Sequence, residues 1–249
     1  MHRRSLLSLA IFSLAVLGVS TPAHAASEPA YRLSGPFTHD NLAIYLIHGR
    51  STEGPVPLTL QEAIARDAIR VHETSSVNEL EIENLGDQEV FVQSGDIVKG
   101  GKQDRVLMVS LLVPPHSGRM QIASFCVEQG RWSARGREDV SRFSSADAAV
   151  PSREAKLAMR APMASKPDTT GSSGSARRRS ETGERQQEVW RSVASAQRKL
   201  SRSVGAPVQS AQSQSSLQLS IENDKVQARV AAYVDALIAE GQRADDVVG

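Results

Sequence analysis

The 249-residue chain contains a single cysteine, Cys126, and only 4% of its residues are aromatic. One cysteine cannot form an internal disulfide, so the fold depends on packing and hydrogen bonds and has no covalent cross-link within the chain. Cys126 is therefore either a small buried hydrophobic residue or a reactive thiol. The buried residue is the commoner case.

The chain also lacks an excess of charge of either sign. Its 29 lysines and arginines against 28 aspartates and glutamates give a formal net charge of +1. Removal of residues 1–25, which hold two arginines and no acidic residue, leaves 27 against 28 and a net charge of −1. Proteins that bind nucleic acid polymers through bulk charge are clearly basic. A nucleic acid polymer is therefore not expected as a partner.

Long apolar runs are missing too. The run at residues 6–19 follows two arginines and covers about fourteen positions, whereas a transmembrane helix needs about twenty. It ends before Pro22 and the triplet Ala23-His24-Ala25. A basic start, a short apolar segment and an A-x-A site are typical of a cleaved secretory signal. We expect residues 1–25 to be a signal peptide cleaved after Ala25, a periplasmic or secreted location, and no membrane attachment after cleavage.

Common catalytic and metal-binding motifs are absent as well. The histidines after residue 25, at positions 39, 48, 72 and 116, show no H-x-H or H-E-x-x-H spacing, so we expect no metal and no other cofactor. No G-x-S-x-G motif is present. The glycines before Lys102 do not form a phosphate-binding P-loop. Their spacing is one residue too long, Gln103 replaces the Ser or Thr that holds magnesium, and a predicted strand follows in place of a helix.

The residues that are present divide the chain after the signal into three parts. Residues 31–132 are rich in β-branched and apolar residues, residues 133–182 in Ser, Ala, Arg and Gly, and residues 183–249 show helical periodicity. The middle part has too little apolar surface to offset its ordering entropy, so we expect mostly loop or disorder there, with one short helix within 151–163. The whole predicts a single α+β domain over residues 31–249, in which a mainly antiparallel sheet or sandwich is followed by amphipathic helices packed on it.

The β-rich part predicts several short strands. Residues 41–47 are apolar on both faces, which is typical of a covered strand. The alternating residues 78–84 and the residues 89–93 flank a Gly-Asp turn and predict a β-hairpin. Residues 105–113 are almost continuously apolar and predict one central strand that pairs with residues 120–127 across a short loop.

Helix signals are clear at three places. Thr59 and Glu62 form a capping-box pattern that opens a short helix. In the C-terminal part, Asp224 is the expected N-cap and Gly241 the expected C-cap of an amphipathic helix that packs against the sheet. An earlier helical stripe consists of Val189, Val193, Ala196 and Leu200.

The last three residues, 247–249, are consistent with either the beginning of a strand or a frayed tail.

Two dense polar blocks, residues 100–107 and 126–132, stand at the ends of two predicted strands. Antiparallel pairing of those strands places Arg105 close to Glu128. A Gly-Gly turn exposes successive backbone N–H groups, and nearby lysine and arginine side chains add charged donors, so together they can hold an anion. The expected ligand-binding residues are Gly100, Gly101, Lys102, Gln103, Asp104, Arg105, Gln129, Arg131 and Trp132.

Several interpretations of these blocks stay open. In one, they form a single polar site that binds a small anionic ligand without catalysis. In another, a hydrolase or transferase acts on such a ligand, with Glu128 as base or Cys126 as nucleophile. An adjacent arginine stabilises a carboxylate and so weakens it as a base. The structural alternative is an Arg–Glu ion pair that closes one end of the sheet, with Trp132 as a packing anchor.

The ordered segments "LTLQEAI", "VNELEIEN", "SGDIVKGGKQDRV", "LVPPHS" and "CVEQGRW", followed by a helix with "EVW", resemble the ARG-and-rhodanese-phosphatase-superfamily-associated protein domain, or ARPP domain. The resemblance runs from about Gly35 to the C-terminus and is strongest at residues 100–105 and 126–132. The family is named for its genomic association with ADP-ribosylglycohydrolases and rhodanese-like phosphatases, and it has no established activity. The resemblance implies an ADP-ribose- or nucleotide-like anion as ligand. It also implies a chain truncated at its C-terminus, since family members continue past a "VVG" segment into a further strand and helix.

Overall fold

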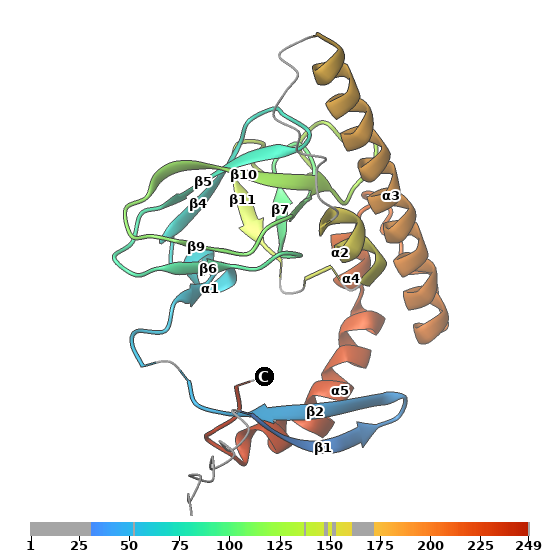
Figure 1. The fold of residues 1–249 in the computed structure, drawn as a ribbon. Helices are drawn as coiled ribbons and strands as arrows, with labels where there is room; N and C mark the ends of the chain where they lie inside the picture. Colours follow the sequence, from blue (N-terminus) through green and yellow to red (C-terminus); the bar gives the residue numbers. More distant parts are fainter. Residues whose placement is uncertain are drawn as a thin grey trace, which may run out of the picture.

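The computed structural model describes residues 31–51, 53–136, 138–146, 149–150, 153–160 and 172–248. It shows an α+β protein with antiparallel sheets and helices packed beside them, as the sequence predicts (Figure 1). The expected signal peptide at residues 1–25 lies outside the described residues.

The elements have the following bounds. The strands are β1 (Arg32–His39), β2 (Leu42–His48), β3 (Leu58–Thr59), β4 (Ile69–Glu73), β5 (Glu79–Asn84), β6 (Val90–Val92), β7 (Ile97–Gly100), β8 (Arg105–Leu107), β9 (Leu111–Val113), β10 (Gly118–Cys126) and β11 (Phe143–Ser145). The helices are α1 (Leu60–Ala65), α2 (Arg153–Arg160), α3 (Ser172–Val204), α4 (Leu217–Ile221) and α5 (Asp224–Gln242).

The largest sheet has six antiparallel strands in the order β11-β7-β8-β10-β5-β4. Its two outer strands approach each other, because Arg142, next to β11, forms an antiparallel bridge with His72 in β4. The sheet therefore curls into a near-barrel. We call the junction between β11 and β4 the seam.

A second sheet of three strands lies at one end of the near-barrel (Figure 1). Its strands β3 and β6 are parallel, and β6 and β9 are antiparallel. The capping box predicted for α1 is confirmed. The Thr59 N–H donates to Glu62 Oε2 at 2.9 Å, and the Glu62 N–H donates to Thr59 Oγ1 at 3.2 Å.

Two strand predictions are wrong in their pairing. Strands β5 and β6 do not form a hairpin, because β5 pairs with β4 and β10 whereas β6 pairs with β3 and β9. Residues 105–113 are not one strand, because β8 belongs to the six-stranded sheet and β9 to the three-stranded sheet. An apolar run indicates burial but not the partner strand, and this run crosses from one sheet to the other. The predicted pairing of β8 with β10 is confirmed, with Arg105 opposite Cys126.

Two apolar cores lie on either side of the large sheet. One fills the near-barrel and includes Leu80, Ile82 and Leu107. The other lies between the sheet and helices α2, α3 and α4, and it includes Phe125 and Val189. The predicted stripe on α3 is confirmed, since Val189, Val193 and Ala196 are buried and Leu200 packs against this core.

The described part of residues 133–182 differs from the expected loop or disorder. It contains β11, α2 and the first turns of α3. Strand β11 is held by its pairing with β7, a long-range contact that local composition does not encode. The short helix expected within residues 151–163 is present as α2.

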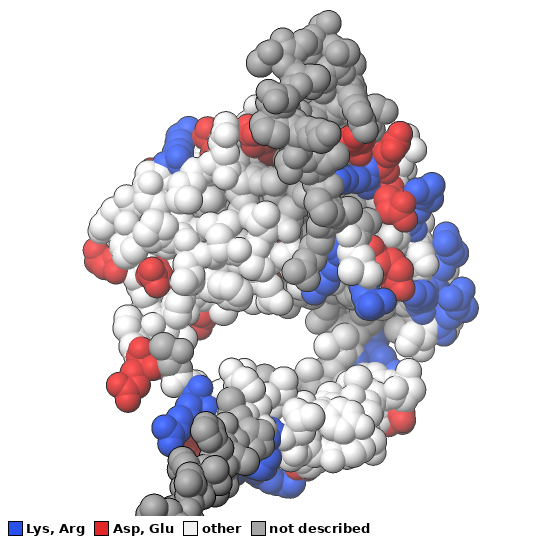
Figure 2. Space-filling view, in the orientation of Figure 1, with Lys and Arg blue, Asp and Glu red and all other residues white. Residues whose placement is uncertain are grey.

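The β1–β2 hairpin and α5 form a part set off from the near-barrel, with an open gap between the two in the space-filling view (Figures 1 and 2). The prediction of a strand covered on both faces is wrong for β2, because Tyr45 is 57% exposed on the side away from α5. Helix α5 packs on this hairpin and not on the large sheet. Its N-cap is Asn223, not Asp224, and Gly241 lies inside the helix, which ends at Gln242.

The C-terminal residues lie along the edge of β2. Val247 forms an antiparallel bridge with His48, and the Val248 N–H donates to the Ile47 carbonyl at 2.8 Å. Residues 247 and 248 are therefore paired with β2.

Candidate functional site

The two polar blocks meet at one end of the β8–β10 pair. The Asp104 N–H donates to Glu128 Oε2 at 3.2 Å, and the Gln103 side chain donates to the Glu128 carbonyl, also at 3.2 Å. Asp104 and Glu128 have no exposed surface. The centre of the two blocks is therefore a buried cluster.

Both buried carboxylates are saturated with hydrogen bonds. Asp104 accepts from the Gly100 N–H at 3.0 Å, from Arg135 Nη1 at 2.9 Å and from Ser216 Oγ at 2.9 Å. Glu128 accepts from Arg131 Nε at 2.6 Å. Each carboxylate is thus paired with a cation, as buried charges require.

Arg131 is fully occupied within this cluster. Besides its bond to Glu128, it donates to the carbonyls of Gly100 and Gly101 at 3.1 Å each and to that of Ser133 at 2.6 Å. Its side chain is only 9% exposed. The sequence predicts that Arg131 donates to a ligand. In the structure its guanidinium donates to groups of the protein itself.

Arg135 is a member of the cluster that the sequence analysis missed. It bonds Asp104 and Glu138, and it is 6% exposed. Burial acts to lower the pKa of the Arg135 guanidinium, but the hydrogen bonds to and charges of Asp104 and Glu138 outweigh it, so the pKa is raised. Arg135 lies in the stretch that composition predicted to be loop or disorder. That stretch contains many arginines, and nothing in the sequence distinguishes Arg135 as a buried one.

Arg105 differs from the other two arginines. It has no exposed surface, and its Nη1 donates to Gln103 Oε1 at 3.1 Å and to Cys126 Sγ at 2.9 Å. Its Nη2 lies 3.8 Å from Glu73 Oε2, beyond hydrogen-bond distance. Within the described residues, Nε and Nη2 of Arg105 have no hydrogen-bond partner.

Trp132 and Lys102 lie at the surface next to Arg105. The Trp132 ring is 47% exposed, and its centroid lies 5.7 Å from both the Lys102 ammonium and the Arg105 guanidinium, which places both cations in cation–π contact. Lys102 also donates to Ser75 Oγ at 2.7 Å. We call Lys102, Arg105 and Trp132 the rim. The exposed Gln129 makes its two bonds to Ser215 through the backbone.

The Gly-Gly turn serves close packing. The Gly101 N–H donates to the Arg142 carbonyl, and a Cβ added to Gly101 would lie 2.3 Å from the Phe143 ring. A Cβ on Gly100 would lie 3.0 Å from the Arg142 carbonyl. The two glycines therefore let residues 142–143 approach the β7–β8 turn and set the position of the seam.

Cys126 is a buried thiol and not an activated nucleophile. Burial is the main cause that raises its pKa to about 11, against a smaller lowering by Arg105. Because only the thiolate is nucleophilic, the native thiol is protonated and unreactive at neutral pH.

We expect Ellman's reagent to react with Cys126 at pH 8 only after unfolding. Since the native pKa is raised, the native thiol ionises only as the pH rises toward 11, whereas an unfolded cysteine ionises near 8.5. The measurement compares absorbance at 412 nm with and without guanidinium chloride. Fast reaction of the native chain contradicts the burial of this thiol.

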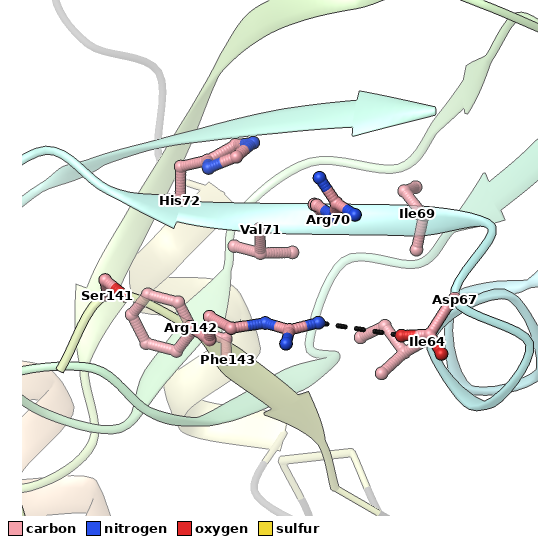
Figure 3. A pocket seen from close by; sticks show the side chains of 9 residues that line it. All are labelled: Ile64, Asp67, Ile69, Arg70, Val71, His72, Ser141, Arg142 and Phe143. Carbon is pink, nitrogen blue, oxygen red and sulfur yellow. Dashed lines mark ion pairs between the residues drawn. The ribbon is translucent and has the colours of Figure 1, made fainter. Parts of the chain in front are cut away.

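A pocket of about 370 Å³ opens at the seam (Figure 3). Its apolar side is formed by Ile64, Ile69, Val71 and Phe143, and its polar side by Asp67, Arg70, His72, Ser141 and Arg142. Figure 3 shows Arg142 extended along the pocket toward Asp67, with 3.6 Å between Nη2 and Oδ1. Sequence reasoning missed this pocket, because it joins β4 to residues about seventy positions away.

The described residues contain neither a metal-binding group nor a membrane-spanning helix. In the part of the chain that the structure describes, no group of three or more His, Cys, Asp or Glu residues is arranged to hold a metal ion. None of the helices formed by the described residues is long and apolar enough to span a bilayer.

Comparison with known proteins gives one match. No curated protein and no solved structure matches the chain. The sequence model of the ARG and Rhodanese-Phosphatase-superfamily-associated Protein domain, ARPP-1, matches residues 30–249, which include both polar blocks, the seam and α5. The chain therefore belongs to the ARPP-1 family, as its motifs suggested.

Proposed function

We propose that this protein is an exported, non-catalytic binding module for a small anionic ligand, and that the ligand occupies the seam pocket. The observation that carries the proposal is that two arginines, Arg70 and Arg142, line a cavity of about 370 Å³ above a floor of core residues. Ligand pockets typically combine mostly apolar walls with a few polar groups that fix orientation.

The charges of the pocket support an anion. Arg142 makes a long contact to Asp67, and the two side chains are 64% and 83% exposed, so this pair contributes little and yields readily to a ligand. His72 is paired with Glu83 at 3.1 Å. Arg70 and Arg142 can each donate to a phosphate or carboxylate in two-pronged geometry.

The ligand class follows from the polar side of the pocket. Ile69, Val71 and Phe143 are at most 8% exposed, so the polar side chains provide most of the surface that a ligand can reach. Guanidinium groups bind phosphate, and a phosphate is part of the ADP-ribose- or nucleotide-like anion that the family resemblance implies. The Gly-Gly turn supports this site indirectly, because it positions Arg142 and Phe143.

The alternative of a hydrolase or transferase acting through Glu128 or Cys126 has weaker support. Glu128 is buried and bonded to Arg131, so it is poorly placed to accept a proton from a ligand. Cys126 is buried with a raised pKa. Neither lines the seam pocket.

The rim is the second candidate location for the same ligand. The two nitrogens of Arg105 without hydrogen bonds favour it, because a buried donor without a partner gains from an anionic acceptor. Trp132 adds a half-exposed ring on which a base can stack. A ligand reaches Arg105 only if Trp132 moves aside, since Arg105 has no exposed surface.

The test is a titration of the full mature chain with ADP-ribose, AMP and inorganic phosphate, followed by differential scanning fluorimetry and calorimetry. For the best of these ligands, we expect the Arg70→Gln/Arg142→Gln double variant to weaken binding by about tenfold or more, since charge-assisted bonds are lost. Arg119→Gln is the matched control, because Arg119 is an exposed arginine in the same sheet.

The outcomes separate the two locations. Weaker ligand binding in the double variant alone supports the seam pocket as the binding site. Weaker ligand binding only in Lys102→Ala or Trp132→Ala assigns the binding site to the rim. No binding of any of the three ligands by the folded chain overturns the proposed ligand class, and mass analysis that detects a product after overnight incubation overturns the non-catalytic reading.

A further inference from the structure

Ser34, His48 and Asp246 form a continuous hydrogen-bond relay in the hairpin part. Ser34 Oγ lies 2.7 Å from His48 Nε2, and His48 Nδ1 lies 2.7 Å from Asp246 Oδ1. Ser34 comes from β1, His48 is the last residue of β2, and Asp246 follows α5, at the C-terminal edge that Figure 1 shows beside β2. Ser34 and His48 belong to one hairpin, whereas Asp246 is 198 residues from His48 and is brought to it only by the fold.

The relay has the connectivity of a nucleophile, a base and an orienting acid. With the proton of His48 on Nδ1, that nitrogen donates to Asp246 while Nε2 accepts from the Ser34 hydroxyl. His48 is 5% exposed, so its ring is held between its partners. The hydrogen bond to His48 is the main cause that lowers the pKa of Asp246, and Arg32 adds to it, so the carboxylate stays ionised at neutral pH.

An apolar groove adjoins the relay. It has a volume of about 380 Å³ and lies between β2 and α5, lined by Leu42, Ile44, Leu46, Tyr233, Val234, Leu237, Ile238 and Gly241. Ser34 is directly opposite Leu46 in the β1–β2 register, so the two side chains lie on the same face of the hairpin. His48 is two residues beyond Leu46 on that face. The relay therefore stands at one end of the groove.

We propose that Ser34, His48 and Asp246 form a serine hydrolase site that cleaves esters with an apolar acyl chain, which the groove binds. The site is separate from the seam pocket and does not depend on the proposed anion binding. Such triads recur on unrelated folds in different chain orders and are recognised by geometry and roles.

The reaction needs only the ester and water. Ser34 Oγ attacks the carbonyl carbon and passes its proton to His48 Nε2. The tetrahedral intermediate then collapses, the bond to the alkoxy oxygen breaks, and the proton moves from His48 to the leaving alcohol. Water, deprotonated by His48, attacks the acyl-Ser34 ester, which releases the carboxylic acid and restores the Ser34 hydroxyl. Asp246 is a positioning residue that fixes the His48 tautomer.

The backbone beside Ser34 is also unusual. A β-bulge between Ser34 and Phe37 takes Gly35 out of the ladder, and bulges next to active sites re-aim side chains. A Cβ on Gly35 would lie 2.8 Å from the Ile44 carbonyl, so only glycine fits there. The His116–Asp87 pair, at 2.8 Å and exposed, provides an internal contrast within the same chain, because no serine among the described residues is hydrogen-bonded to its ring.

The test uses the full mature chain with a fluorophosphonate probe and p-nitrophenyl esters of two to twelve acyl carbons. We expect the probe to label Ser34, as mapped by mass spectrometry of the peptides, and hydrolysis to favour medium chains over acetate by about tenfold or more, because each buried methylene adds to binding. Ser34→Ala and His48→Ala should each lower kcat at least about a hundredfold. Asp246→Asn should lower kcat with little change in KM.

Controls keep the result decisive. His116→Ala removes a histidine from the exposed pair and should leave labelling and hydrolysis unchanged. Ile238→Gln should erase the preference for medium chains without preventing labelling, because Ile238 lines the groove and is 50% exposed. If the wild-type chain is folded by circular dichroism but neither takes the label at Ser34 nor hydrolyses any ester, the relay is a structural latch for the C-terminal segment and the proposal is overturned.

Discussion

Replacing Asp104 by alanine is expected to lower the free energy of unfolding by about 3–5 kcal/mol, the range seen when one partner of a buried ion pair is removed. Asp104 has no exposed surface and accepts from the Gly100 N–H, Arg135 and Ser216. Its loss leaves the Arg135 guanidinium buried without its main carboxylate. Urea unfolding followed by circular dichroism measures the change.

Asp87→Ala is the matched control for this variant. Asp87 is also an aspartate in an ion pair, with His116, but its side chain is 98% exposed. Exposed pairs contribute about 1 kcal/mol or less. A similar loss of unfolding free energy in both variants would contradict the burial of the Asp104–Arg135 pair.

The second large effect is expected for Gly101→Ala, which should lower the free energy of unfolding by about 2–4 kcal/mol. Gly101 has a φ of +54°, a conformation that costs other residues roughly 1–2 kcal/mol. The new Cβ would also lie 2.3 Å from the Phe143 ring, and overpacking of a buried contact typically costs about 1–3 kcal/mol. Because Phe143 must shift, ligand binding in the seam pocket should weaken as well.

Gly118→Ala separates the two causes. Its φ of +63° is close to that of Gly101, but a Cβ there meets nothing within 4 Å. In this variant, backbone strain alone should lower the free energy of unfolding by about 1–2 kcal/mol, and ligand binding should be unchanged. If the free energy of unfolding falls equally in Gly101→Ala and Gly118→Ala, the close approach to Phe143 does not contribute to the effect at Gly101.

Together these results would assign the two polar blocks a structural role. Asp104, Glu128, Arg131 and Arg135 hold one end of the β8–β10 pair, and the Gly-Gly turn holds the seam. The dense charge at residues 100–105 is then a buried framework that shapes a neighbouring pocket. A buried ion cluster of this kind specifies geometry more than it adds net stability.

Part of the candidate site could be predicted from the sequence. The apolar runs and the short loop between them predicted an antiparallel pair with Arg105 close to Glu128, and the structure pairs these strands with Arg105 opposite Cys126. Burial of the blocks could not be predicted, because the same charged residues suit a solvated turn or a buried cluster equally well. Arg135 was missed because its role depends on Asp104, a contact between residues 31 positions apart.

Local sequence patterns were sufficient to predict the elements whose cause is local. The capping box at Thr59, the stripe on α3 and the α+β class follow from side chains within a few residues of each other, whose periodicity and hydrogen bonds act along the chain. The strand pairing, the position of the seam and the link from Ser34 through His48 to Asp246 could be seen only in the folded chain. These features depend on contacts between residues that are far apart in the chain, and their energy comes from packing and burial that no local pattern specifies.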